Sequence, residues 1–295
     1  MYQQKFNVQT EQNAVAGILA DKIAISSYQQ ISVRPQNNRV NFLPAKFSPI
    51  IYSCPLGLSL AASWQQTPQS IMQELIHLMT STADDSNQNL SDKLLVEAAS
   101  TGWLNFHLDA KFIAQWLERM LLNRQVQIGT EQQERRVGIL SGDLAIAELF
   151  FAQYIHARCC SLLRLGTREK LISFSGLAAD LEKASWQAEQ PSSIAWLDEQ
   201  GDLWLRSSSE VNLIKQLLIV TDAWQENHLE AYWSKLALSL SQSAAIFLAE
   251  CRFLGQVKQR YPQKAIARLG LIALIQFWLE KMLREKLEIA APQEI

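Results

Sequence analysis

Hydrophobic and polar positions follow two different patterns in the two halves of the chain. In the first half, short apolar runs alternate with turn-forming residues, which predicts both helices and strands. We expect helices over 11–27, 56–64, 68–79 and 109–122, a hairpin or two short strands within 31–42, and strands over 94–96 and 103–108. Thr67 followed by Pro68 is a helix start, because proline fits the first helical position, and Asp109 is expected to cap the helix after it. This half is predicted to be a small α+β domain.

From Gly142 onward the helical period dominates. One apolar stripe and one more polar face run along the first helix, and further helices fit 211–220, 229–254 and 263–287. The exception is 193–206, where two tryptophan-containing triplets flank Asp-Glu-Gln-Gly-Asp and predict a local β-hairpin. The predicted fold class is therefore mostly α, a small α+β domain followed by an all-α helical bundle.

A polar, charged stretch separates the two patterns. It reads RQVQIGTEQQERRVGILS and spans 124–141. We predict an N-terminal domain over 1–124, a linker over 125–141 and a helical domain over 142–295.

Composition and charge narrow the class of protein. Hydrophobic residues make up 48% of the 295 residues and charged residues 19%, which is ordinary for a globular chain. The formal net charge of -2 excludes a uniformly basic nucleic-acid coat. Residues 251–295 carry 8 basic and 4 acidic residues, a modest surplus that marks where a polyanion would be expected to bind. The apolar stretch 269–279 is shorter than the ~20 residues that span a bilayer, and the first ten residues lack a signal-peptide core. With only four cysteines, we expect a cytoplasmic protein with reduced thiols and no membrane partner.

Catalytic and cofactor motifs are absent from the sequence. It contains no phosphate-binding glycine loop, no dinucleotide fingerprint and no nucleophile elbow. His156 with Cys159 and Cys160 is an incomplete metal set, better explained as a helix with buried thiols. We therefore expect no catalytic residue, no metal and no cofactor.

Trp103 is the aromatic residue that invites a functional interpretation. It follows Gly102 at a strand start and lies next to Asn105, so an exposed ring beside an amide could stack on and read an unpaired base. From the residues alone, packing in the core is the favoured interpretation.

Several segments resemble one family, the arginyl-tRNA synthetases. FFAQYIHARCCSLLR (Phe150–Arg164) resembles the QYAHAR helix that opens their anticodon-binding (DALR) domain. The segments Phe247–Leu254, Ala267–Leu271 and Ala291–Glu294 resemble later parts of that domain, in the same order. Ser53–Leu75 and the GWLNFHL run Gly102–Leu108 resemble the additional N-terminal domain of these enzymes. The resemblance covers roughly 50–125 and 142–295.

The catalytic domain of that family has no counterpart in the chain. It should lie between the two matching parts, with its HIGH-type and KMSK-type signatures, and only the predicted linker stands there. At most ~3.5 Å per residue, that stretch cannot hold an ATP site. The resemblance thus implies a protein that keeps the tRNA-binding ends and lacks ligase chemistry.

The resemblance also implies roles for particular residues. Trp103 and Asn105 match positions that contact the D-loop of tRNA, whereas Arg252, Arg268 and Ile295 become candidates for the anticodon side. Arg268 is the favoured phosphate ligand, since arginine presents a rigid fork to phosphate oxygens. The sequence departs from the family at two of these positions. The family commonly ends in Met where this chain ends in Ile295, and it usually has Phe at the position of Trp103. Both replacements keep an apolar side chain, so they bear on the specificity for an arginine tRNA and do not exclude RNA binding. Three residues of the matching helix are expected to pack rather than to touch RNA: Tyr154, His156 and Arg158.

The leading hypothesis is a non-catalytic, synthetase-like protein that binds tRNA, with an arginine tRNA among the candidates, and serves as an adaptor or regulator. Its protein partner would be a tRNA-modifying enzyme or a synthetase, and DNA is not expected to bind. The alternatives are a protein-interaction module that has lost RNA binding, with the hairpin at 193–206 as its contact, and a non-catalytic subunit of a split synthetase.

Overall fold

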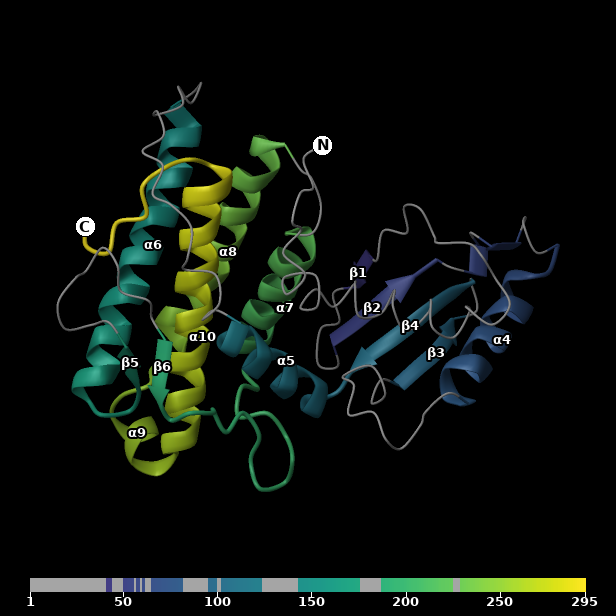
Figure 1. The fold of residues 1–295 in the computed structure, drawn as a ribbon, viewed down its shortest axis with the longest axis horizontal. Coiled ribbons are helices and arrows are strands. Elements are labelled where there is room, and N and C mark those ends of the chain that lie inside the picture. The colour runs from purple at the N-terminus through teal and green to yellow at the C-terminus, as the bar shows by residue number, and fades with distance from the viewer. Residues whose placement is uncertain are drawn as a thin grey trace, which may run out of the picture. The chain divides into compact units, whose positions relative to one another are not determined.

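The computed structural model describes residues 41–43, 50–55, 57–58, 60–61, 65–81, 95–99, 102–123, 143–175, 187–224 and 229–295. The chain divides into two compact units, Met1–Trp116 and Leu117–Ile295 (Figure 1). The predicted helix over 11–27, most of the hairpin over 31–42 and the predicted linker over 125–141 lie outside the described residues. The domain limits at 124 and 142 accordingly stay predictions.

The first unit contains a four-stranded antiparallel sheet. Its strands are β1 (Asn41–Leu43), β2 (Ile50–Cys54), β3 (Leu95–Ala99) and β4 (Trp103–Leu108), in the spatial order β1-β2-β4-β3. Phe106 of β4 pairs with Tyr52 of β2 and Val96 of β3, which fixes the register across the centre of the sheet. Side chains alternate along β4, with Leu104, Phe106 and Leu108 buried. Every second residue of β4 therefore belongs to the core.

Two helices of this region begin where the local sequence predicts. Helix α4 (Pro68–Ser81) starts after Thr67, whose hydroxyl accepts a hydrogen bond from the backbone N–H of Ser70 at 3.2 Å. Helix α5 (Ala110–Asn123) starts after Asp109, whose carboxylate accepts from the N–H of Phe112 at 2.6 Å. Both predicted helix starts are confirmed, and Asp109 caps α5 as expected.

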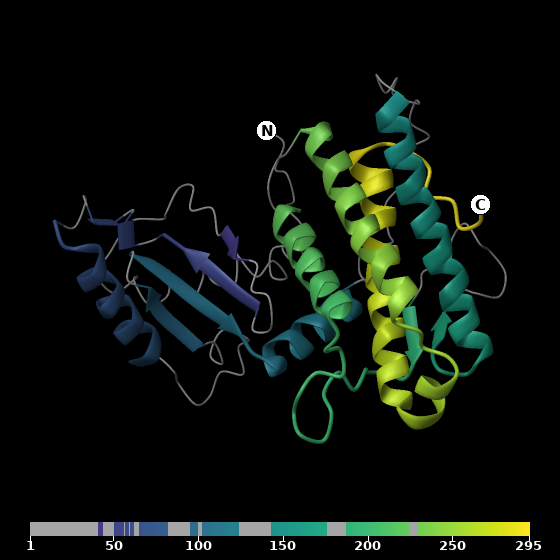
Figure 2. The same cartoon turned by 180° about the vertical axis from the view of Figure 1, so that it is seen from behind.

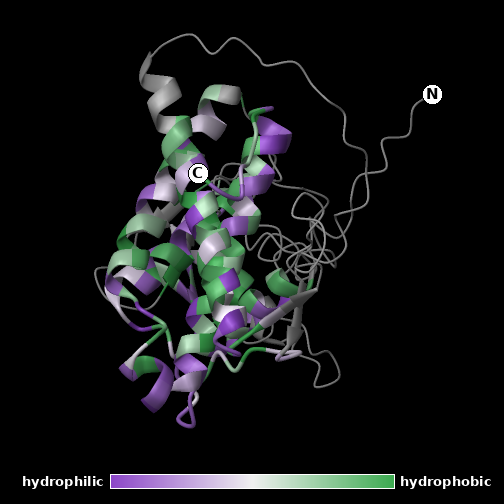
Figure 3. Cartoon of the chain, turned by 90° about the vertical axis from the view of Figure 1, so that its left-hand side faces the viewer, coloured by the Kyte–Doolittle hydropathy of each residue, from purple (hydrophilic) through white to green (hydrophobic). Residues whose placement is uncertain are grey.

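The second unit is a helical bundle built around one buried helix. Its helices are α6 (Asp143–Arg168), α7 (Ser208–Ala223), α8 (Glu230–Glu250), the short α9 (Gln256–Arg260) and α10 (Pro262–Lys281), which continues into a π-helix, η2 (Met282–Lys286). Figures 1 and 2 show α10 running between α6 and α8, and it contacts α7 as well. Almost every residue from Ala265 to Leu279 is buried, because apolar residues occur on all sides of this helix. The two buried polar side chains in this stretch, Arg268 and Gln276, have hydrogen-bond partners. The helices that surround α10 carry both polar and apolar residues (Figure 3).

The prediction of an all-α second domain is wrong in one detail. A two-stranded antiparallel ribbon, β5 (Ser173–Ser175) with β6 (Gln187–Gln190), follows α6. The predicted hairpin at 193–206 is present, since Leu197 bridges Leu203 and the N–H of Trp204 donates to the carbonyl of Trp196 at 2.9 Å. The described chain is thus mostly helical, with one small sheet and this ribbon. No described helix has the length and apolar character needed to cross a membrane.

Candidate nucleic-acid interface

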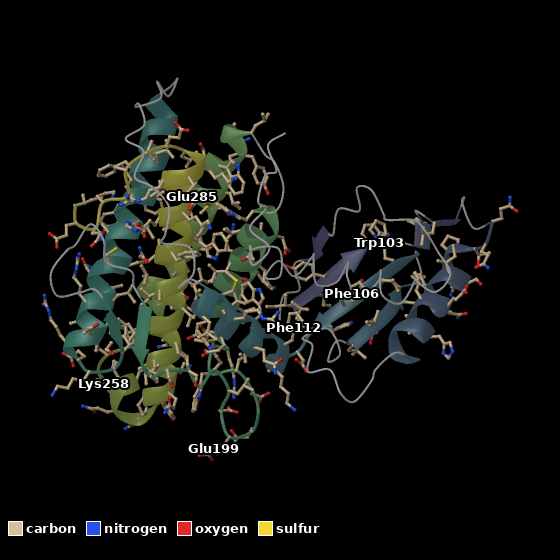
Figure 4. The ribbon with its side chains drawn as sticks, viewed as in Figure 1. Trp103, Phe106, Phe112, Glu199, Lys258 and Glu285 are labelled. Atoms are coloured by element: carbon tan, nitrogen blue, oxygen red, sulfur yellow. The ribbon has the colours of Figure 1, made fainter. Side chains whose placement is uncertain are left out.

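One face of the sheet presents half-exposed side chains. Trp103, Asn105 and His107 occupy the alternate positions of β4 that the core residues leave, and all three are half-buried. Trp103 is therefore neither fully buried nor fully exposed, which leaves both packing and contact with a ligand open to it. The labels in Figure 4 place Trp103 near one end of the strand and Phe106 further along it.

The neighbouring strand β3 adds a negatively charged side chain, Glu97, to this face. Glu97 of β3 lies opposite Asn105, and its carboxylate accepts from Nε2 of His107 at 3.0 Å. Glu97 is itself exposed, with Leu95 exposed beside it. The face thus combines an aromatic ring, an amide and a polar pair at adjacent positions, a set that can stack on a base and hydrogen-bond its edge.

A second exposed surface lies on the outer side of α6. Phe150 and Tyr154 are 56% and 47% exposed, and Arg158 is exposed one further helical turn along. Spacing of four residues places all three on one side of the helix. The expectation that Tyr154 and Arg158 only pack between helices is wrong, since neither side chain is buried.

His156 is the member of that trio that does pack. It is fully buried, its Nδ1 lies 2.8 Å from the carbonyl oxygen of Pro292, and the side-chain amide of Gln276 lies 3.0 Å from Nε2. A carbonyl only accepts hydrogen bonds, so Nδ1 carries the proton and Nε2 accepts from Gln276. Both ring nitrogens are engaged in this way, which leaves neither to bind a metal.

The same side of α6 holds the C-terminal segment. Gln153 donates to the carbonyl of Ala290 at 2.7 Å, and Arg164 donates to the side chain of Gln293 at 2.9 Å and approaches Glu294 at 3.3 Å. Together with the His156 bond, these contacts fix the segment 290–294 along α6. Ile295 follows it and is 65% exposed, so a predicted contact residue is accessible at the surface.

Arg268 lies in the interior. Its Nε donates to the carboxylate of Glu210 at 2.7 Å, and its guanidinium also donates to the backbone carbonyl of Arg252. The exposed fractions of the two side chains are 8% and 0%. This burial contradicts the expected phosphate contact, because the guanidinium is already engaged by a carboxylate and hidden from solvent.

Glu210 owes its place to the start of α7. Ser207 is the N-cap, and Ser207 and Glu210 form a capping box, in which the carboxylate accepts from the N–H of Ser207 at 2.8 Å. The remaining oxygen of the carboxylate then faces Arg268 of α10. A local helix-start signal and a distant arginine thus meet in one ion pair.

The candidates for metal and thiol chemistry do not form a site. No group of three or more metal-ligating side chains is found within the described ranges. Cys159 and Cys160 are buried in α6, and burial raises the pKa of the Cys159 thiol well above its ordinary value. Because the thiolate is the reactive form, Cys159 is held unreactive in the folded protein.

The hairpin predicted as a protein contact is anchored to the bundle. The indole Nε1 of Trp196 donates to the carboxylate of Glu118 at 2.8 Å, and Trp196 is only 3% exposed. A Cβ atom on Gly270 of α10 would approach the Trp196 ring to 2.6 Å, so glycine is required for this close approach. The tip of the hairpin around Glu199 is exposed (Figure 4), and the exposed Arg206 forms ion pairs with Asp198 and Asp202 beside it.

No known protein family, curated protein or solved structure matches this chain. The assignment of a function therefore depends on the surfaces described above.

Proposed function

We propose that this protein is a non-catalytic RNA-binding protein whose ligand is a tRNA, with an arginine tRNA as the first candidate. The observation that carries the proposal is the half-exposed face of β4, where Trp103, Asn105 and His107 lie side by side. An aromatic ring and an amide at alternate strand positions can stack on one unpaired base and bond the edge of another. Two of these three residues, Trp103 and Asn105, are the ones that the sequence resemblance assigns to D-loop contacts.

The helical unit supports the proposal with a different kind of surface. Phe150, Tyr154 and Arg158 provide two exposed rings and a cation along α6, and Ile295 is exposed after a segment fixed to the same helix. Exposed aromatic rings with an arginine are the side chains that unpaired bases stack on. On the proposal, RNA loops are bound by both units, and neither contact requires a nucleotide substrate or a metal.

The protein-interaction alternative rests on the hairpin at 193–206. Its first tryptophan is buried against Glu118 and Gly270, so the apolar part of the hairpin contributes to the core of the bundle. The tip around Glu199 remains for a partner, and it carries no exposed aromatic ring. The aromatic surfaces on β4 and α6 therefore favour RNA as the ligand.

Variants of Trp103 test the proposal directly. Trp103→Leu keeps an apolar side chain but removes the aromatic face, and should weaken binding of a tRNA transcript by ~1–3 kcal/mol, the contribution of one stacked base. Trp103→Phe restores a face and should recover most of the affinity. Leu122→Ala, at a 46%-exposed position on α5, is the control and should bind as the wild type does. Equal affinities of the Leu and Phe variants would refute stacking by Trp103.

A further inference from the structure

The connection between α8 and α10, together with most of α10 itself, has an unusual distribution of charge. No acidic residue occurs from 251 to 279, whereas Arg252, Lys258, Arg260, Lys264 and Arg268 all fall within it. This segment contains much of the basic excess of the C-terminal region. Which of these cations are available to a ligand depends on their partners.

The structure separates paired from unpaired cations. Arg268 is buried against Glu210, and Lys258 approaches the carboxylate of Glu169 at 2.6 Å. Within the described part of the chain, no ion pair is recorded for Arg252, Arg260 or Lys264, and both arginines are exposed. Among the residues that the structure describes, two exposed arginines on the connection and one half-buried lysine near the start of α10 therefore have no ion-pair partner.

An exposed aromatic ring lies among these cations. Tyr261 separates α9 from α10 and is 51% exposed, and its ring lies 6.3 Å from that of Trp204. Around it, Gln256, Gln259 and Gln263 are also exposed. Lys258, labelled in Figure 4, marks this end of the bundle, opposite the end where Glu285 lies.

We infer that this connection is a phosphate-binding patch for RNA, with Arg252 and Arg260 as its principal ligands and Lys264 and Tyr261 beside them. The inference rests on the proposed RNA-binding function. It assigns to this patch the phosphate contacts that supply most of the electrostatic affinity for RNA. Arginine suits phosphate oxygens because its donors form a rigid fork. The aromatic ring and the glutamines favour RNA over an acidic peptide, since they can stack on a base or bond a ribose.

A salt titration tests the patch. The full chain carrying Arg252→Gln and Arg260→Gln is titrated with a tRNA transcript at several salt concentrations, beside the wild type. Each lost phosphate contact should reduce the slope of log K against log salt by ~0.7–0.9, so the double variant should lose roughly 1.5. Lys111→Gln with Lys235→Gln removes the same charge from exposed positions on α5 and α8 and should leave the slope unchanged.

The outcomes separate this inference from the function on which it rests. If the wild type binds RNA and both double variants lose equal slope, or neither loses any, the patch is refuted while RNA binding stands. If the wild type binds no RNA, the proposed function falls and the patch with it. Polyglutamate is titrated in parallel, and binding of that peptide through Arg252 and Arg260 without RNA binding would replace RNA by an acidic protein partner. Thermal melts establish that each variant is folded.

Discussion

Replacing Arg268 by methionine is expected to damage the stability of the helical unit rather than its ligand binding. The change removes a guanidinium whose Nε lies 2.7 Å from a carboxylate of Glu210 that is fully buried. Glu210 would then keep the N–H of Ser207 as a partner but lose its compensating charge. Removing one partner of a buried ion pair typically costs about 3–5 kcal/mol, because an isolated charge is left in a medium of low dielectric. For a unit of this size, the melting temperature should fall by roughly 10 °C.

The assay is chemical and thermal denaturation followed by far-ultraviolet circular dichroism. Arg268→Met combined with Glu210→Gln serves as the matched variant, because an amide at 210 no longer leaves a buried charge. The double variant should recover much of the lost free energy of unfolding, which would give a large coupling between the two positions. Glu210→Gln is also measured alone. If the effects of Arg268→Met and Glu210→Gln on the free energy of unfolding simply add in the double variant, the ion pair is refuted. A stable Arg268→Met protein with weakened RNA binding would instead restore Arg268 as a phosphate ligand.

Three further predictions concern other buried positions. Cys159 should resist alkylation at mildly alkaline pH and react only on unfolding, because burial raises the pKa of its thiol. Mass spectrometry of pulse-labelled protein measures this reaction, and rapid labelling of the native protein would contradict the prediction. Burial lowers the pKa of Lys281 in the folded protein. At pH values between this lowered pKa and the ordinary lysine pKa, Lys281 is more protonated in the unfolded chain than in the folded one. The free energy of unfolding should therefore rise with pH in this range. Lys281→Met should flatten this alkaline rise in urea titrations, and an unchanged rise would show that other groups cause it. Gly270→Ala should destabilise the bundle by ~1–3 kcal/mol, because its methyl group would press on Ile194 and Trp196; an unchanged denaturation midpoint would mean that the hairpin shifts freely.

Local signals predicted the parts of the fold that depend on a few neighbouring residues. The Thr67–Pro68 and Asp109 helix starts are short-range hydrogen-bond patterns, so the sequence alone contains them. The alternation of β4 likewise separates Phe106 from Trp103 and Asn105 without knowledge of the partner strands. The ribbon β5–β6 was missed because β5, Ser-Phe-Ser, is too short to show a strand period and β6, Gln-Ala-Glu-Gln, contains only one small apolar residue.

Pairing across long separations was beyond the sequence. Arg268 and Glu210 are distant in the chain, and nothing near either residue indicates that they form an ion pair. The C-terminal contacts of His156 and Arg164 were missed for the same reason, although their shared face on α6 is visible in the helical spacing. Which cations remain available to a ligand is decided by such pairs, so the choice between Arg252 and Arg268 required the structure.

Titration of the wild-type protein with tRNA is the most direct test of the account. An arginine tRNA transcript and total tRNA are compared by mobility shift at low and near-physiological salt. We expect a complex that survives the higher salt and is stronger for the arginine tRNA. Absence of a complex, or a complex lost equally for every RNA as salt rises, would contradict specific tRNA binding.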